Sequence, residues 1–269
     1  MHGPALMRRL MKVRLAQGGD EIRVAQRLRH RVFLEERGLS ASEVSGLDAD
    51  KYDAVAHHLL VVEPAEGKPS DFALADGNLV GTYRLITRDG AAQVGGFYSG
   101  QEFDLAPLLA RKPDLKFLEL GRSCILKEAR GAQAIELLWQ GIWDFVREHR
   151  IDVMLGCASF EGTDVSRHAA ALHFLARHRP VPAEWRVPAR PERVCTLPTA
   201  SPNATDDKRL MQELPPLVKG YLRLGCYFGE GCVIDREFNT IDVLVILPVT
   251  AINPRYFERF GRPTTAQSS

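Results

Sequence analysis

The sequence lacks the features of a membrane-spanning or nucleic-acid-binding protein. Its longest strongly apolar run near the C-terminus covers residues 243–249 and contains Pro248, whereas a helix needs about 20 residues to cross a bilayer. Residues 1–15 are basic, but they hold no uninterrupted apolar stretch of signal-peptide length. The formal net charge is only +1, and no basic stripe is present. These absences predict a cytoplasmic protein without a nucleic-acid partner.

Signatures of several enzyme classes are missing as well. The five cysteines are irregularly spaced and form no C-x-x-C pair, which disfavours a zinc site and favours a reducing compartment. No cluster of metal ligands stands out, so no bound metal is expected. The G-x-S-x-G elbow of serine hydrolases is absent, and none of the eight histidines begins the His-x4-Asp motif of glycerolipid acyltransferases.

What remains is the composition of an ordinary globular protein with alternating strands and helices. The 269 residues are 45% hydrophobic and 26% charged, enough to bury a sizeable core. Apolar periodicity predicts strands at residues 58–62, 79–87, 116–126, 151–157 and 241–247. It predicts helices at residues 20–38, 133–149, 164–178 and 214–224. The order strand–helix–strand across residues 116–157 is a βαβ signature, so we predict a mixed α/β fold.

The segments between these elements suggest one domain rather than two. Residues 40–53 have loop composition, residues 64–76 suggest a hairpin connection, and a turn is expected at Asp89 and Gly90. Residues 179–203 are too rich in proline for regular structure. The helix and strand after them are too small to form a core alone. We therefore expect a single domain over residues 1–269, with a Pro-rich surface excursion at about residues 179–210.

Two charged residues, Glu119 and Arg122, stand in the apolar strand expected at residues 116–126. Burying a charge is costly unless it is paired. A spacing of three places the two side chains on opposite faces of a strand, so they need different partners. Arg122 could meet a phosphate or a carboxylate, and Glu119 could receive a proton from an amine. Structural ion pairs with other strands are an equally open interpretation.

Arg130, Gly131 and Ala132 directly precede the helix expected at residues 133–149. A helix N-terminus presents unpaired backbone N–H groups and a partial positive charge, which suit a phosphate. A helix start that binds no ligand is the more common alternative. The basic segment at residues 23–31 is open in the same way, since it could face an acidic partner or simply be a solvated helix face.

Five segments together resemble the bacterial ornithine-lipid N-acyltransferases. The central one is Leu-Glu-Leu-Gly-Arg-Ser-Cys-Ile at residues 118–125, and the others lie at residues 136–142, 152–160, 214–225 and 235–242. The resemblance spans roughly residues 20–260. A wider similarity connects the chain with autoinducer synthases and the GNAT acyltransferases. It implies three α-β-α layers around a mixed, centrally split sheet.

The family acts without a cofactor of its own, because its donor is a 3-hydroxyacyl group carried on the 4'-phosphopantetheine arm of acyl carrier protein. The acceptor is the α-amine of L-ornithine and the product is lyso-ornithine lipid, so a transient membrane-surface contact is implied. The phosphate loop is reduced to Arg130, Gly131 and Ala132. That reduction suits the single phosphate of the arm and makes these residues the implied phosphopantetheine-binding positions.

The resemblance also assigns roles within the expected site. Glu119 is the implied catalytic base, with Arg122 beside it, and Cys124 and Cys157 are expected to be core residues. Backbone N–H groups of residues 122–125 would stabilise the oxyanion. The residues that fall in the order of autoinducer synthases, and are implied to bind substrate, are Arg29, Phe33, Glu36, Asp48, Asp53 and Arg84. Asp48 and Asp53 are expected to bind the acceptor amine or to be the alternatives to Glu119 as the base.

Two other functions stay open. The same donor could serve another amine, such as glutamine, lysine or S-adenosylmethionine. Alternatively, the fold could bind acyl carrier protein or lipid without turnover, although Glu119 and Arg122 on one strand argue against that. The chain is longer than an autoinducer synthase, which disfavours lactone synthesis.

Overall fold

The computed structural model describes residues 11–39, 46–65, 67, 70–197 and 207–256. The chain forms two compact units. The first, here the N-terminal unit, comprises Met1–Leu85 and Gly121–Phe145, and the second, the C-terminal unit, comprises Ile86–Leu120 and Val146–Ser269. Strands β4 (Gly77–Thr87) and β5 (Phe117–Ile125) run from one unit into the other. Among the described residues, no helix combines the length and the apolar character needed to cross a membrane.

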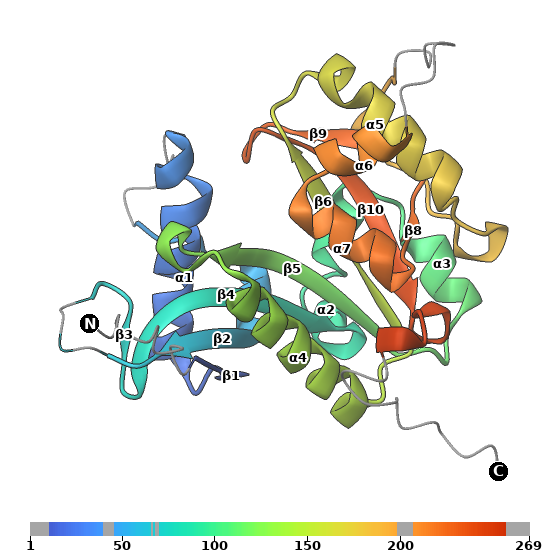
Figure 1. Ribbon diagram of the computed structural model, residues 1–269. Helices are drawn as coiled ribbons and strands as arrows, with labels where there is room; N and C mark the ends of the chain where they lie inside the picture. The colour runs from blue at the N-terminus through green and yellow to red at the C-terminus, as the bar shows by residue number, and fades with distance from the viewer. Residues whose placement is uncertain (1–10, 40–45, 66, 68–69, 198–206, 257–269) are drawn as a thin grey trace. The chain divides into compact units, whose positions relative to one another are not determined.

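The sheet of the N-terminal unit has the strand order β1-β2-β4-β5 (Figure 1). β2 (His57–Glu63) and β4 are antiparallel neighbours, which confirms the predicted hairpin, and the short β3 (Ala73–Leu74) lies in their connection. β1 (Lys12–Leu15) pairs with β2 at the edge. No strand is predicted there from the sequence, because four residues with two charges show little periodicity.

Helices α1 (Gly19–Phe33) and α4 (Ala132–His149) cover opposite faces of this sheet. A Cβ on Gly141 of α4 would lie 2.9 Å from Leu59 of β2, so glycine allows the helix to pack closely there. The preceding strand residue, His58, points to the other face, because side chains alternate along a strand. It contacts the backbone of Asp53, which also binds Arg29 of α1.

The first helix is shorter than its pattern predicted. The α-helix ends at Phe33, and a 3₁₀ turn, η1 (Glu35–Arg37), follows before Gly38 at φ 66°. Gly38 is in the left-handed region that commonly ends a helix. The sequence therefore located the stop correctly but did not show the change of helix type before it. Residues 40–45 of the loop predicted at residues 40–53 lie outside the described residues.

The C-terminal unit has the strand order β5-β6-β10-β9-β7. β5 and β6 (Val153–Glu161) are parallel and joined by α4, which confirms the βαβ prediction. Their pairing covers only Phe117 to Glu119, although each strand has nine residues. The pairing ends at Glu119 and Leu155, which is consistent with a centrally split sheet. β10 (Thr240–Pro248), by contrast, pairs with β6 along its whole length.

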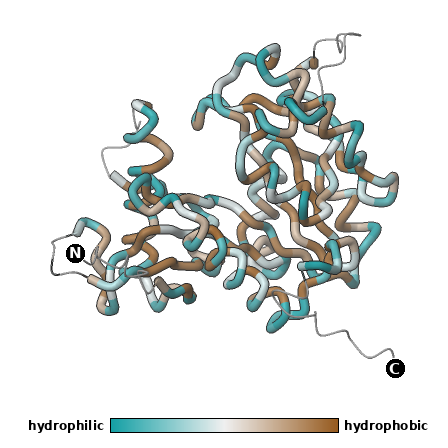
Figure 2. Tube along the Cα trace, in the orientation of Figure 1, coloured by the Kyte–Doolittle hydropathy of each residue, from teal (hydrophilic) through white to brown (hydrophobic). Residues whose placement is uncertain are grey.

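Helices pack on one face of β6 and β10. α5 (Val165–His178) begins at Asp164, whose side chain accepts a hydrogen bond from the Ser166 N–H, and its His168 ring lies 5.3 Å from that of Phe160. Figure 2 shows the hydrophobic residues concentrated along the strands of each unit. The remaining helices are α2 (Arg88–Gln93), α3 (Ala106–Arg111), α6 (Asp207–Glu213) and α7 (Pro216–Leu224).

Two local predictions need correction. The expected turn at Asp89 and Gly90 is the first part of α2, because the Thr87 hydroxyl accepts the Gly90 N–H and caps a helix. The Pro-rich stretch contains a 3₁₀ turn, η5 (Ala183–Trp185), and a strand, β7 (Val194–Cys195), which pairs with β9 (Cys232–Asp235). β7 itself contains no proline, so the prolines around it do not prevent it from pairing. Residues 198–206 lie outside the described part of the chain.

β7 and β9 bring two thiols together, and we predict that oxidation joins them. Cys195 and Cys232 are cross-strand partners with their Sγ atoms 2.8 Å apart. Titration with a mild disulfide-forming oxidant, followed by thiol counting under denaturing conditions, should reduce the five reactive thiols to three. In the Cys195→Ser variant the same treatment should leave all four remaining thiols reactive. Retention of all five in the unaltered chain would contradict the prediction.

Candidate functional site

Six charged side chains form one ion network in the N-terminal unit. The three cations are Arg29 on α1, Arg84 on β4 and Arg122 on β5. The three anions come from the segment at the 3₁₀ turn η2 (Lys51–Val55) and are Asp48, Asp50 and Asp53. The structure therefore brings together five of the residues singled out from the sequence, and adds Asp50.

The pair between Arg29 and Asp53 is bidentate. Nη1 of Arg29 donates to Oδ1 of Asp53 at 2.9 Å and Nη2 donates to Oδ2 at 2.7 Å. The Arg29 Nε atom also lies 2.8 Å from the Asp48 carboxylate. Both members of the bidentate pair are buried, so water does not weaken their attraction as it does at a surface.

Arg84 and Arg122 extend the network to Asp50. Nη1 of Arg84 lies 2.7 Å from Asp50 and 3.1 Å from Asp53. Arg122 lies 3.1 Å from Asp48 and 3.5 Å from Asp50, and its side chain is the most exposed of the three arginines. Its φ of 51° interrupts the regular strand, which re-aims the side chain.

The electrostatics show how tightly the network is coupled. Burial acts to raise the pKa of Asp53, but the hydrogen bonds and charges of Arg29 and the charge of Arg84 outweigh it and hold that pKa far below its usual range. Burial, followed by the Arg29 charge, lowers the pKa of His58 to about 4. These contacts engage the carboxylates with arginines of the same unit, so the network stabilises the fold around η2. Their roles in binding substrate stay predictions.

Asp50 was missed from the sequence, although a local signal exists. Its side chain caps η2 by accepting the Tyr52 N–H, and the Asp53 side chain accepts the Asp50 N–H in return. The spacing of three between these two residues is that of a capping box. The other expected residues of this unit lie at the end of α1, in η1 and at the start of α4. Arg130 forms an ion pair with Glu36, Gly131 and Ala132 lead into α4, and Phe33 is half-buried.

Glu119 lies in the C-terminal unit and its carboxylate is fully engaged by one turn. Oε2 accepts the Tyr98 N–H and Oε1 accepts the Ser99 N–H, both at 2.7 Å. The Ser99 hydroxyl also donates to Oε1. Tyr98 begins the 3₁₀ turn η3 (Tyr98–Gln101). Glu119 is 2% exposed, so the geometry gives it a clear structural task, which is to hold η3 against β5.

Glu102, directly after η3, is a candidate that sequence reasoning missed. It is 2% exposed, and its Oε2 accepts a hydrogen bond from the Cys157 thiol at 3.3 Å. Burial, followed by the nearby charge of Asp242, raises the pKa of Glu102 to about 7. A carboxyl group that titrates near neutral pH suits proton transfer. No local pattern announces it, because its neighbours come from distant strands.

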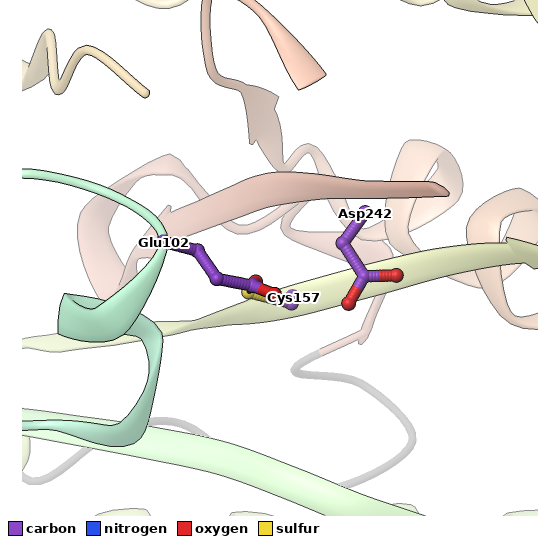
Figure 3. A group of neighbouring side chains, drawn as sticks. All are labelled: Glu102, Cys157 and Asp242. Carbon is purple, nitrogen blue, oxygen red and sulfur yellow. The ribbon is translucent and has the colours of Figure 1, made fainter. Parts of the chain in front are cut away.

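Figure 3 shows Glu102, Cys157 and Asp242 grouped around β6 and β10. One ligand atom from each lies within 4.8 Å of the others, so the group has the composition to hold a cation. Burial and the two carboxylates raise the pKa of Cys157 well above its usual value. The sulfur is therefore a protonated donor rather than a thiolate nucleophile or metal ligand. Proton transfer or ammonium binding by the carboxylates fits this chemistry best.

Comparisons with known proteins agree with this geometry. A family profile described as Acetyltransferase (GNAT) domain matches residues 28–140. FeeM, an N-acyl amino acid synthase from uncultured soil microbes, superposes with a TM-score of 0.52 at 13% identity, covering 93% of this chain and 98% of that one. At this identity the likeness concerns the fold alone, and it confirms the GNAT-like mixed sheet expected from the sequence.

Two curated relatives align over nearly the whole chain. L-ornithine N(alpha)-acyltransferase of Rhizobium meliloti (strain 1021) is 44% identical over 255 residues, which cover 93% of this chain and 84% of that protein. The protein of the same name from Rhodobacter capsulatus is 37% identical over 254 residues, covering 93% and 95%. Identity at this level over this length, on a GNAT fold, establishes an N-acyltransferase. The chain belongs to the L-ornithine N(alpha)-acyltransferase family.

Proposed function

We propose that this enzyme transfers a 3-hydroxyacyl group from acyl carrier protein to the α-amine of L-ornithine and releases lyso-ornithine lipid. The observation that carries the proposal is the 44% identity, over 93% of the chain, to a relative whose name specifies both ornithine and its α-nitrogen. A protonated amine must lose a proton before it attacks a thioester. Glu102, whose pKa is raised to about 7, could accept that proton, and Glu119 holds the turn that precedes it.

The choice of acyl carrier protein as donor is supported by two features of the N-terminal unit. Arg23, Arg27 and Arg31 are exposed on α1 at spacings of four, so they lie on one side of the helix and could meet an acidic carrier. Arg130 and Gly131 precede α4 and Ala132 is its first residue; at such a helix N-terminus backbone N–H groups and the helix dipole favour a phosphate. The donor's own phosphopantetheine arm would supply that phosphate, so the enzyme itself needs no cofactor.

The remaining expected roles fit the same reaction as proposals. Arg122, the least buried arginine of the network, is suited to hold the ornithine carboxylate. Backbone N–H groups of residues 122–125 would stabilise the oxyanion, since β5 no longer pairs with β6 beyond Glu119. The product carries a long acyl chain, and it would leave through a transient contact with the inner face of the cytoplasmic membrane.

The test is a thiol-release assay with the purified enzyme, 3-hydroxyacyl-acyl carrier protein and a panel of amines. We expect release that depends on L-ornithine and yields an amide of matching mass. Nα-acetylornithine, whose α-amine is blocked, should give none. Release with glutamine or lysine would move the acceptor, and a lactone formed from S-adenosylmethionine would overturn the proposal. Replacing the carrier-protein donor by the coenzyme A thioester tests the choice of donor. Turnover with the coenzyme A thioester should be much lower.

A further inference from the structure

The hydrogen bonds of η3 indicate that Glu119 and Glu102 have different tasks in the reaction. We propose that Glu102 accepts the proton from the attacking amine, and that Glu119 is the positioning residue that holds η3, and with it Glu102, in place. This inference rests on the proposed transfer of an acyl group to an amine. It names the group that makes that amine nucleophilic.

Glu119 is poorly placed to receive a proton and well placed to fix a turn. Its two oxygens accept the consecutive N–H groups of Tyr98 and Ser99 together with the Ser99 hydroxyl. Each of these bonds favours the charged carboxylate. Protonation would weaken all three at once and release η3 from β5.

Ser99 links this anchor directly to Glu102. While its N–H and hydroxyl bind Glu119, its carbonyl accepts the N–H of Glu102 at 3.1 Å and that of Phe103 at 2.9 Å. Phe103 is completely buried, so the chain after the turn is fixed as well. The Glu102 N–H is thus held by the carbonyl of Ser99, and Ser99 is itself held by Glu119.

The sheet face beneath Glu102 is polar and opens to solvent at Ser159, whereas Glu102 and Asp242 are themselves only 2% and 6% exposed. Along β6, Cys157 is half-buried and Ser159 is exposed, while Ala158 and Phe160, on the other face, are buried. Ser159 is the cross-strand partner of Asp242 on β10, which places Asp242 on the polar face too. An ammonium group approaching over Ser159 therefore meets the carboxylates of Asp242 and Glu102.

The titratable and charged groups around Glu102 come from three strands and from the segment before β7. They are the Cys157 thiol on β6, Asp242 on β10, Asp235 on β9, and Arg193 before β7, whose guanidinium lies 3.9 Å away. Two of these are carboxylates, and with burial they outweigh the single cation, so the pKa of Glu102 rises to about 7. An ordinary glutamate titrates near 4.5. The raised pKa of Glu102 makes it a stronger base than an ordinary glutamate, so proton transfer from the ammonium is less unfavourable.

In the proposed reaction the ammonium nitrogen loses two protons and gains the acyl group. The ammonium gives one proton to the Glu102 carboxylate, and its freed electron pair forms the C–N bond to the thioester carbonyl carbon. The C–S bond breaks, its electron pair leaves on sulfur, and the thiolate takes the second proton from the new nitrogen centre. Glu102 then releases its proton to solvent. Asp242 would hold the ammonium before transfer by charge attraction.

The experiment compares the pH dependence of kcat/KM for the unaltered enzyme, Glu102→Gln and Glu119→Gln, with acyl carrier protein donor and L-ornithine. The unaltered enzyme should gain activity through an apparent pKa of about 7. Glu102→Gln should lose about 10²–10⁴ in turnover and lose that limb of the profile. Glu119→Gln should lose less and keep the limb at a shifted midpoint. Glu192→Gln, the same charge change at an exposed position, should leave the profile unchanged.

Two further measurements separate chemistry from folding. Glu102→Ala leaves a space of carboxylate size, so added formate should restore part of the activity of this variant. Formate should restore no activity in Glu119→Ala. Titration of the ¹³C-labelled glutamate carboxyls should assign the group near pH 7 to residue 102. The proposal is overturned if Glu102→Gln retains its turnover, or if the limb disappears only in Glu119→Gln. The turnover of the unaltered enzyme with ornithine reports separately on the proposed function.

Discussion

Replacing Asp53 by Asn is expected to lower the free energy of unfolding by about 3–5 kcal/mol, the usual effect of removing one partner from a buried ion pair. Both Asp53 oxygens accept hydrogen bonds from Arg29, and Gln26 donates to one of them. An Asn side chain has the same shape but presents an NH₂ group to one of these donors. Arg29 then keeps a buried charge without its main partner. Urea unfolding followed by circular dichroism measures the loss.

Acid should weaken the unaltered protein in the same region. The folded pKa of Asp53 lies below its unfolded value, so its contribution to stability is complete above the unfolded pKa and is lost as the pH falls through the folded one. His58 acts in the same direction, because its folded pKa is about 4 rather than 6.5. Glu102 acts in the opposite direction, because its pKa is raised from 4.5 to about 7, and it offsets His58 above about pH 4.5. The net stability should therefore decline below about pH 4.5. In Asp53→Asn the contribution of residue 53 to that decline should be missing.

Asp76 provides a matched control at the surface. It also pairs with an arginine, Arg14, at 2.8 Å, but its side chain is 30% exposed. Exposed pairs contribute about 0–1 kcal/mol, so Asp76→Asn should change the free energy of unfolding by no more than that. Equal losses of unfolding free energy in Asp53→Asn and Asp76→Asn would contradict the prediction, because burial would then add nothing to the stabilisation by the ion pair.

Replacing Gly156 by Ala should disrupt the C-terminal unit, with a loss of more than about 4 kcal/mol. An added Cβ at this position on β6 would lie 2.2 Å from the carbonyl oxygen of Leu120. That oxygen belongs to the backbone of β5, so a side-chain rotation cannot relieve the clash. The contact lies just beyond the last paired residues, Glu119 and Leu155. The variant must therefore move one strand at the point where the sheet splits.

Gly121→Ala is the corresponding control on β5. A Cβ there meets no atom within 4 Å, and alanine loses less conformational freedom on folding than glycine. Thermal unfolding should show little change for Gly121→Ala and a large fall, or failure to fold, for Gly156→Ala. A Gly156→Ala variant as stable as Gly121→Ala would mean that the strands part more widely than this contact indicates.

The elements that sequence analysis predicted well are those with a strong local pattern. The apolar spacing of α4 and the uninterrupted apolar run of β10 depend on neighbours within one segment, so periodicity reveals them. β1 and β7 were missed because short edge strands exist through their pairing with β2 and β9. The turn predicted at Asp89 failed for a similar reason, since capping by Thr87 selects a helix.

The residues of the candidate site also differ in how far the sequence alone reveals them. Arg29, Asp48, Asp53, Arg84 and Arg122 are identifiable from the order of motifs along the chain, but only the structure shows that they bind one another. Asp50 had a local capping signal that could have found it. Glu102 had none, because the thiol that contacts it lies 55 residues away in the chain.

The sequence by itself determined the family, the mixed α/β fold and the strand on which Glu119 and Arg122 stand, because motifs and periodicity are local properties of a chain. Only the tertiary structure decided how these charges are used. It satisfies Glu119 with the donors of η3 and places Glu102 beside Cys157 and Asp242. A carboxyl group's pKa depends on burial and on nearby charges, and both arise when distant strands pair.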